Sequence, residues 1–214
     1  GDQVEQGEVL LELDGTQARS DLAVVESRLM TALGRRARLR AERDGDNAVD
    51  FPSPLTDADD AEKAGEIMTN QKAIFTARRR ALETDLNLRA QRIDEFETQI
   101  NGLQSRLGSV ESQIDSYTEE VDEWSGLVED QLSDKQSLRE ARRRLNEYRG
   151  ERGRLVADIA GIRAQIASSR MERSLRKEEY DQEVATQLGE VQGQILDARA
   201  RISALRDKLS RTVM

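Results

Sequence analysis

The stretch IDEFETQINGLQSRLGSVESQIDSYTEEVDEW, residues 93–124, decides the fold of this 214-residue chain. Its apolar side chains recur at alternating intervals of three and four residues, and the side chains between them are mostly charged or polar. The apolar set is Ile93, Phe96, Ile100, Leu103, Leu107, Val110, Ile114, Tyr117, Val121 and Trp124. This is the a and d pattern of a heptad repeat, which gives a helix one narrow apolar stripe. Because such a stripe is buried only against another helix, the pattern predicts a coiled coil.

The composition supports long helices and argues against several functional classes. Charged residues make up 35% of the chain, aromatic residues 3%, and there are two prolines, which is typical of coiled coils. The absence of Cys and His removes disulfides, thiolate chemistry and the commonest general base and metal ligand. These absences fit a structural part without a catalytic role, a cofactor or a metal. The net charge of −9 disfavours a nucleic-acid partner, and the arginine triplets at 78–80 and 142–144 are interpreted as solvated, ion-paired helix faces.

The two ends of the chain carry its β signals. Val9, Leu11 and Leu13 alternate with their neighbours after turn signals at Gly1 and Gly7, and this pattern predicts a short strand within residues 1–14. The final residues, 211–214, are expected to begin another strand.

A first helix is predicted at about residues 16–44, with Thr16 or Asp14 as its N-cap and Gly45 just beyond its end. Leu22, Val25, Leu29, Ala32 and Leu39 share one face of this helix, with Arg36 at the missing seam position.

The segment Gly45–Thr56 contains both prolines of the chain, so we expect it to be an extended connection. Phe51 and Leu55 are expected to pin it to a neighbouring helix. Its acids lack the spacing of an EF-hand loop, so a solvated loop is favoured over a calcium site.

A second helix is predicted at about 57–125 and a third at about 134–209, with the bend at 126–133. The seam of the third helix includes Leu138, Leu145, Tyr148, Leu155, Ile159, Ile162, Ile166, Tyr180, Val184, Val191, Ile195, Ala198, Ile202, Leu205 and Leu209. The seam is weakest where Arg79 and Arg89 approach Ser169 and Arg173.

The fold class is therefore all-α: a long antiparallel coiled-coil hairpin that the second and third helices complete by themselves. The first helix is expected to lie beside the base of the hairpin as a third member of a bundle.

Several segments, taken in order, resemble a known family. The run GDQVEQGEVLLELD at 1–14 resembles the first half of a lipoyl module, but no Lys precedes Lys63 to carry a cofactor. ARLRAERDG at 37–45, FP at 51–52, FTARR at 75–79, GLV at 126–128 and GERG at 150–153 are similar to the haemolysin-secretion branch of the periplasmic adaptors, or membrane fusion proteins, of type I secretion systems.

The resemblance implies a split lipoyl-like domain, with halves at 1–14 and from 211, interrupted by the α-helical hairpin domain at 15–210. It also implies a non-catalytic adaptor, the periplasmic portion of a single-pass inner-membrane protein. The expected partners are an inner-membrane ABC transporter, an outer-membrane tunnel protein, further copies in a hexameric ring, and the exported polypeptide. A coiled-coil structural scaffold without a transport role is the alternative.

The functional residues are expected at the bend. Leu127, Val128, Leu132 and Ser133 form the candidate partner-binding site, with Leu127 and Val128 protruding and Ser133 contributing a hydrogen bond. A structural role is equally open, since these apolar residues could close the end of the coiled coil over Trp124.

Overall fold

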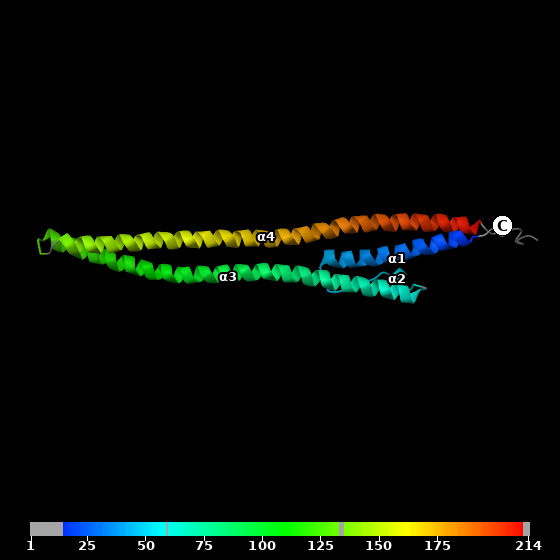
Figure 1. The fold of residues 1–214 in the computed structure, drawn as a ribbon, viewed down its shortest axis with the longest axis horizontal. Helices are drawn as coiled ribbons and strands as arrows, with labels where there is room; N and C mark the ends of the chain where they lie inside the picture. Colours follow the sequence, from blue (N-terminus) through cyan, green and yellow to red (C-terminus); the bar gives the residue numbers. More distant parts are fainter. Residues whose placement is uncertain (1–14, 59, 133–134, 212–214) are drawn as a thin grey trace, which may run out of the picture. The chain divides into compact units, whose positions relative to one another are not determined.

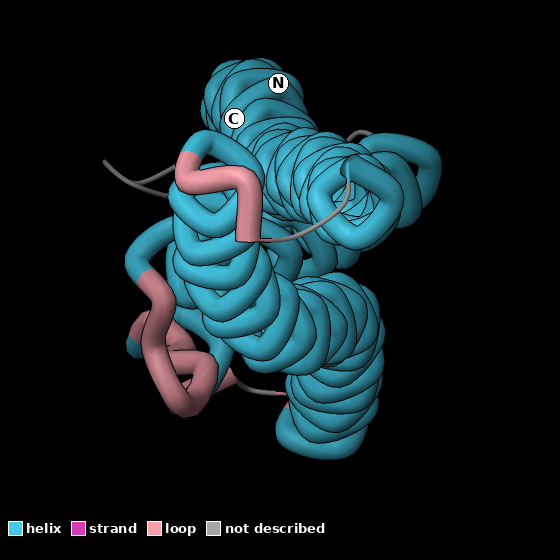
Figure 2. Tube along the Cα trace, turned by 90° about the vertical axis from the view of Figure 1, so that its left-hand side faces the viewer, coloured by secondary structure: helices cyan, strands magenta, loops and turns pink. Residues whose placement is uncertain are grey.

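The computed structural model describes residues 15–58, 60–132 and 135–211, and within them every regular element is a helix. The helices are α1 (Thr16–Asp44), α2 (Ser53–Thr56), α3 (Ala61–Glu129) and α4 (Lys135–Ser210) (Figures 1 and 2). The predicted all-α class is confirmed. The predicted strand at 1–14 and residues 212–214 lie outside the described residues.

The chain forms two compact units, which we call the two-helix unit (residues 85–176) and the three-helix unit (residues 1–84 and 177–214). In the two-helix unit, α3 and α4 run antiparallel and bury the predicted seam against each other (Figure 1). One cluster joins Ile93 and Ile100 to Ile159 and Ile166. Each buried aliphatic side chain of this kind contributes roughly 1.5–3 kcal/mol, so the seam holds the hairpin together.

The next cluster along the seam is centred on Val110, Ile114, Leu145 and Leu155. Beside it the rings of Tyr117 and Tyr148 stack with their centroids 5.4 Å apart. These contacts confirm the predicted antiparallel pairing and fix its register.

Ion pairs occupy the weak part of the seam. Arg89 donates to Asp85 on its own helix and to Glu172 on α4, at 3.1 Å in each case, and Arg176 donates to Asp85 at 3.0 Å. All these side chains are partly exposed, so each pair contributes at most about 1 kcal/mol. Polar contacts thus replace apolar ones at this end of the two-helix unit.

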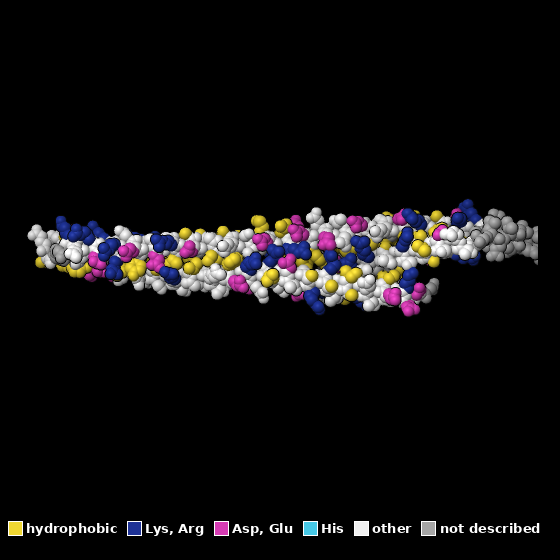
Figure 3. Space-filling model, in the orientation of Figure 1, with side chains coloured by type: hydrophobic (Ala, Val, Ile, Leu, Met, Phe, Trp, Pro, Cys, Tyr) yellow, Lys and Arg dark blue, Asp and Glu magenta, His cyan; other side chains and the backbone are white. Residues whose placement is uncertain are grey.

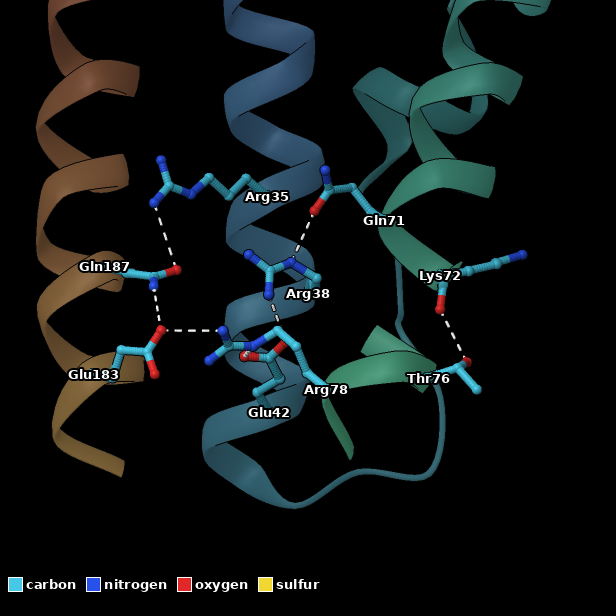
Figure 4. A network of polar contacts seen from close by, with 9 residues as sticks. All are labelled: Arg35, Arg38, Glu42, Gln71, Lys72, Thr76, Arg78, Glu183 and Gln187. Carbon is cyan, nitrogen blue, oxygen red and sulfur yellow. Dashed lines mark hydrogen bonds and ion pairs between the residues drawn. The ribbon is translucent and has the colours of Figure 1, made fainter. Parts of the chain in front are cut away.

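In the three-helix unit, α1 lies between α3 and α4 (Figure 4) and provides apolar surface to both of them. Val25 of α1 packs with Ala198 and Ile202 of α4, whereas Ala37 and Ala41 pack with Phe75 of α3. The third helix of a bundle is confirmed, but the expectation that the long helices complete this end by themselves is wrong. The physical reason is that α1 has two apolar faces, and it takes up seam side chains of both neighbours.

The backbone of α1 approaches α3 closely at Gly34. A Cβ atom at this position would lie 2.8 Å from Cγ2 of Ile67, closer than carbon atoms pack. The absence of a side chain at Gly34 therefore allows the two helices to come together.

The connection between α1 and α3 is pinned as predicted. Gly45 takes a left-handed conformation with φ 72° and ends α1. Leu55 is almost fully buried in the core. Phe51 packs against two hydrophobic clusters of the three-helix unit. The expectation of an extended segment throughout is wrong, because Ser53–Thr56 forms the single turn α2. A proline is compatible with the first turn of a helix, which explains how Pro54 is accommodated.

At the start of α1, the N-cap position is Gly15, and no side chain caps the helix. The predicted N-cap role of Thr16 is therefore wrong, since Thr16 is already helical. Asp14, the other candidate, lies outside the described residues.

A polar network links the three helices through the buried carboxylate of Glu42 (Figure 4). The side chain of Glu42 is 0% exposed and pairs with Arg38 of α1 and Arg78 of α3. Arg38 also donates to Gln71 at 2.9 Å, and Arg78 donates to Glu183 of α4 at 3.0 Å. Because every member has a charged or polar partner on another helix, the network favours one relative rotation of the three helices.

Arg78 is half-buried and not the solvated surface residue that the arginine triplet suggested. Its guanidinium lies 5.2 Å from the ring centroid of Tyr180. Burial acts to lower the pKa of Arg78, but the hydrogen bond to Glu183 and the charges of Glu42 and Glu183 outweigh it and raise the pKa. Burial also raises the pKa of Tyr180. Arg79, one residue on, instead donates to the connection at Asp46 and Asn47.

The bend of the hairpin begins later than expected. α3 continues through Gly126 to Glu129, and the left-handed conformation falls on Gln131, with φ 61°. The amides of Gln131 and Leu132 donate to the carbonyls of Val128 and Leu127 at 3.2 and 2.9 Å. This is the hydrogen-bond pattern of a Schellman motif, in which the residues after a helix donate to carbonyls of its last turn. Gln131 occupies the left-handed position of the motif, where glycine is usual.

We predict that Glu42→Gln destabilises the fold strongly. Loss of the charge leaves the buried Arg38 without its carboxylate, which costs about 3 kcal/mol or more. Urea unfolding followed by circular dichroism measures the change. Glu183→Gln is the matched control, since Glu183 is 45% exposed and its loss is expected to cost less than about 1 kcal/mol. Equal losses in the two variants would show that Glu42 has no special role.

We also predict that Gln131→Gly raises the melting temperature. Glycine adopts positive φ without a steric penalty, a gain of about 1 kcal/mol. Gly126→Ala is expected to raise it too, because Gly126 is helical and a Cβ there meets nothing within 4 Å. A lower melting temperature for Gly126→Ala would instead place the turn at Gly126.

Candidate docking tip

The bend brings together three of the four predicted site residues. Leu132 is 74% exposed and Leu127 is 38% exposed, while Val128 is half-buried. Ser133 lies outside the described residues. The exposed apolar surface of the bend is therefore carried by the two leucines.

Val128 does not protrude as expected, because it continues the seam of α3. It follows Val121 by seven residues and Trp124 by four, which places it at an a position facing α4. Leu127 is one residue earlier and so lies beside the seam. Val128 is part of the seam, and not of a protruding loop, because α3 continues past Gly126 to Glu129.

The Schellman motif holds the two leucines next to each other. The backbone amide of Leu132 donates to the backbone carbonyl of Leu127, so the backbone of Leu132 lies close to that of Leu127 although the two are five residues apart. In this motif an apolar contact between these two positions is common. The backbone thus presents two leucine side chains from one short, hydrogen-bonded turn.

Residues beneath the bend are more buried than the two leucines. Trp124, Val121 and Val128 are half-buried on α3, and the Trp124 indole donates to Glu120 at 3.3 Å. One seam layer further down, Tyr117 stacks on Tyr148. Leu127 and Leu132 are thus the more exposed apolar side chains of the bend, and Trp124 and Val128 the more buried ones.

The rest of the described chain offers no comparable chemical site. No group of three or more acidic side chains in the described ranges is arranged to hold a metal ion. A shallow groove of about 430 Å³ between α1 and α4 is lined by Val25, Arg28, Arg35, Asp197 and Arg201, among others. Its charged side chains come from solvated helix faces, so it has no buried polar group to orient a ligand.

The part of the chain that the structure describes has no helix suited to cross a membrane. None of its helices combines the length and the apolar character that crossing a bilayer requires.

Comparisons with known proteins agree with this architecture. A family model described as "AprE, long alpha-helical hairpin" matches residues 18–208. The type I secretion system membrane fusion protein PrsE of Rhizobium meliloti is 29% identical over 99% of this chain and 48% of its own length. The alkaline protease secretion protein AprE of Pseudomonas aeruginosa is 28% identical over 90% of this chain and 44% of its own length.

Solved structures show the same relationship. The soluble domain of LipC, a membrane fusion protein of a type I secretion system, superposes with a TM-score of 0.94 at 28% identity, over 100% of this chain and 80% of that one. The periplasmic adaptor EmrA shares the fold with a TM-score of 0.56 at 18% identity, over 100% of this chain and 56% of that one.

The chain spans about half the length of the two curated relatives. The resemblance to type I secretion adaptors is confirmed over nearly the whole chain. With its seam, its bend and this family match in agreement, the chain belongs to the AprE family of long alpha-helical hairpins.

Proposed function

We propose that this chain is the hairpin part of a periplasmic adaptor in a type I secretion system. The observation that carries the proposal is the pair of exposed leucines at a hydrogen-bonded bend, on a hairpin of the AprE family. The adaptor links an inner-membrane ABC transporter to an outer-membrane tunnel protein and forms part of the conduit for the exported polypeptide. It is non-catalytic and acts by spanning distance and by docking.

The helices suit the spanning role. The 69 residues of α3 rise about 100 Å at 1.5 Å per residue. An antiparallel seam resists bending because each side chain of the stripe is held between residues of the other helix. Helices of this length suit a part that spans distance.

Leu127 and Leu132 are the docking residues, with Val128 and Ser133 beside them. Burial of an exposed leucine on a partner contributes roughly 1.5–3 kcal/mol. In a hexameric ring of adaptors the same small contact is repeated, and repetition converts a weak contact into a stable one. The tunnel protein is therefore expected to offer matching apolar surface at its periplasmic end.

Residues outside the described ranges complete the proposed domain plan. Residues 1–14 and the segment beginning near 211 supply the two halves of a lipoyl-like domain, and the whole protein is a single-pass inner-membrane protein. A structural scaffold is the alternative function. It is less well supported because both curated relatives are secretion proteins that match over 90% or more of this chain.

The docking role predicts that Leu132→Asp in the whole adaptor abolishes export. A carboxylate at this position would have to be buried without a partner when the tip docks. Because Leu132 is 74% exposed, the melting temperature is expected to change by less than about 2 °C. Export of the system's own substrate into the medium and melting of the purified chain are the two measurements.

Met171→Asp is the matched control, since Met171 is also 74% exposed but belongs to α4 away from the bend. It is expected to leave export intact. Normal export by a folded Leu132→Asp adaptor would remove the docking role, and a large drop in its melting temperature would assign Leu132 to the closing of the coiled coil.

A further inference from the structure

The two helices beside the bend carry opposite charges. Between Leu107 and Asp130, α3 and the first residue of the bend have eight acidic side chains and no Lys or Arg. The acids are Glu111, Asp115, Glu119, Glu120, Asp122, Glu123, Glu129 and Asp130. Between Lys135 and Arg154, α4 has eight basic side chains against three acidic ones. The basic set is Lys135, Arg139, Arg142, Arg143, Arg144, Arg149, Arg152 and Arg154.

These charges do not neutralise each other inside the hairpin. Among the described residues, none of these eight acids forms an ion pair with a basic side chain of α4. Within this part of α4, Arg143 and Arg144 both pair with Glu140. Glu151 pairs with Arg106 of α3, which precedes the acidic segment. The basic side chains are exposed, and so are all the acids except the half-buried Glu120. Figure 3 shows Lys and Arg side chains gathered over the end of α4 next to the bend.

The heptad positions explain why the charges remain apart. With Val110 at a d position and Ile114 at an a position, Asp115, Glu119 and Glu123 occupy b, f and c positions, on the side of α3 away from the seam. On α4, Arg139, Arg143 and Arg154 occupy the equivalent b, f and c positions when Leu145 is a and Tyr148 is d. Side chains at these positions point away from the other helix of the same hairpin. Each hairpin therefore has an acidic outer flank on α3 and, through Arg139, Arg143 and Arg154, a basic outer flank on α4. The other five basic side chains lie at a, e or g positions, where they are still exposed.

We propose that these flanks bind each other between copies of this chain. The acidic flank of α3 in one copy packs beside the basic flank of α4 in the next copy. Two different surfaces meet in this heterologous contact, so it repeats from copy to copy and forms a ring when the rotation between copies closes. The inference specifies the lateral contact of the proposed adaptor ring, and in that respect it rests on the proposed function.

The position of the charges selects a parallel arrangement of copies. Arg106 of α3 contacts Glu151 of α4 at 2.6 Å, and Tyr117 stacks on Tyr148, so the acidic and basic segments lie at the same level of the hairpin. Two hairpins that stand side by side with their bends together therefore align the full length of both flanks. A polyanion such as nucleic acid is a poorer occupant, because the acidic flank of the same hairpin would repel it.

Single cysteines test the contact directly, since the natural chain has none. Ser112 on α3 and Gly150 on α4 are both exposed f positions at similar levels, and a Cβ at Gly150 meets nothing within 4 Å. A mixture of Ser112→Cys chains and Gly150→Cys chains, treated with a short bis-maleimide, is expected to give the mixed dimer. Ala164→Cys replaces Gly150→Cys in the control, because it is the f position two heptads away, about 21 Å along the helix.

Charge reversal tests the cause. One variant carries Asp115→Lys, Glu119→Lys and Glu123→Lys, and the other carries Arg139→Glu, Arg143→Glu and Arg154→Glu. Either variant alone places charges of like sign against each other at the three reversed positions of the contact, so the yield of cross-linked dimer is expected to fall at least about fivefold. A mixture of the two, with Ser112→Cys on the first and Gly150→Cys on the second, is expected to regain the parent yield within about twofold.

Raising NaCl from about 25 to about 500 mM is expected to lower the parent yield several-fold, because screening shortens the range of the attraction. A parent yield no higher than that of the Ala164 control would overturn the proposal, as would insensitivity of the yield to both reversals. Failure of the docking role at Leu132 is detected separately by export, and it leaves the cross-linking result unaffected.

Discussion

A helix with apolar residues only at a and d positions has one place to bury them, the equivalent stripe of another helix. The described structure follows from this constraint. In the two-helix unit the stripe of α3 around Ile100 meets that of α4 around Ile159. In the three-helix unit, α1 receives seam residues from both long helices. Where the stripe is interrupted, at Arg89, charged partners take the place of apolar ones.

Much of this fold was predictable because heptad spacing is local information. The all-α class, the bounds of the first helix and the antiparallel pairing follow from the intervals between apolar residues. The place of α1 was harder to predict, because the faces of a helix do not show which neighbours it contacts. The same holds for the Glu42 network. The i, i+4 spacing of Arg38 and Glu42 is visible in the sequence, whereas their contacts with Gln71 and Arg78 arise only when α3 packs against α1.

The bend was predicted in position but not in detail. Gly126 suggested an early bend, since glycine commonly ends helices, yet the left-handed residue is Gln131. That shift moves Val128 into the seam and leaves Leu127 and Leu132 as the exposed pair. Propensity fails here because the seam continues to Val128, and the burial of one more apolar residue outweighs the cost of an unfavourable backbone conformation at a single position. The family resemblance, by contrast, depended on the order of whole segments, so it did not depend on this detail.

The antiparallel seam also limits how such hairpins can change in length. Removal of seven residues from α3 alone would leave one heptad of α4 without a partner and displace the bend. Removal of a matching seven from each helix would keep every a and d residue paired and the turn intact. Insertions and deletions in relatives should therefore occur as matched heptads in both helices. Each step alters the reach of the hairpin by about 10 Å, so the distance that a hairpin of this kind spans takes discrete values.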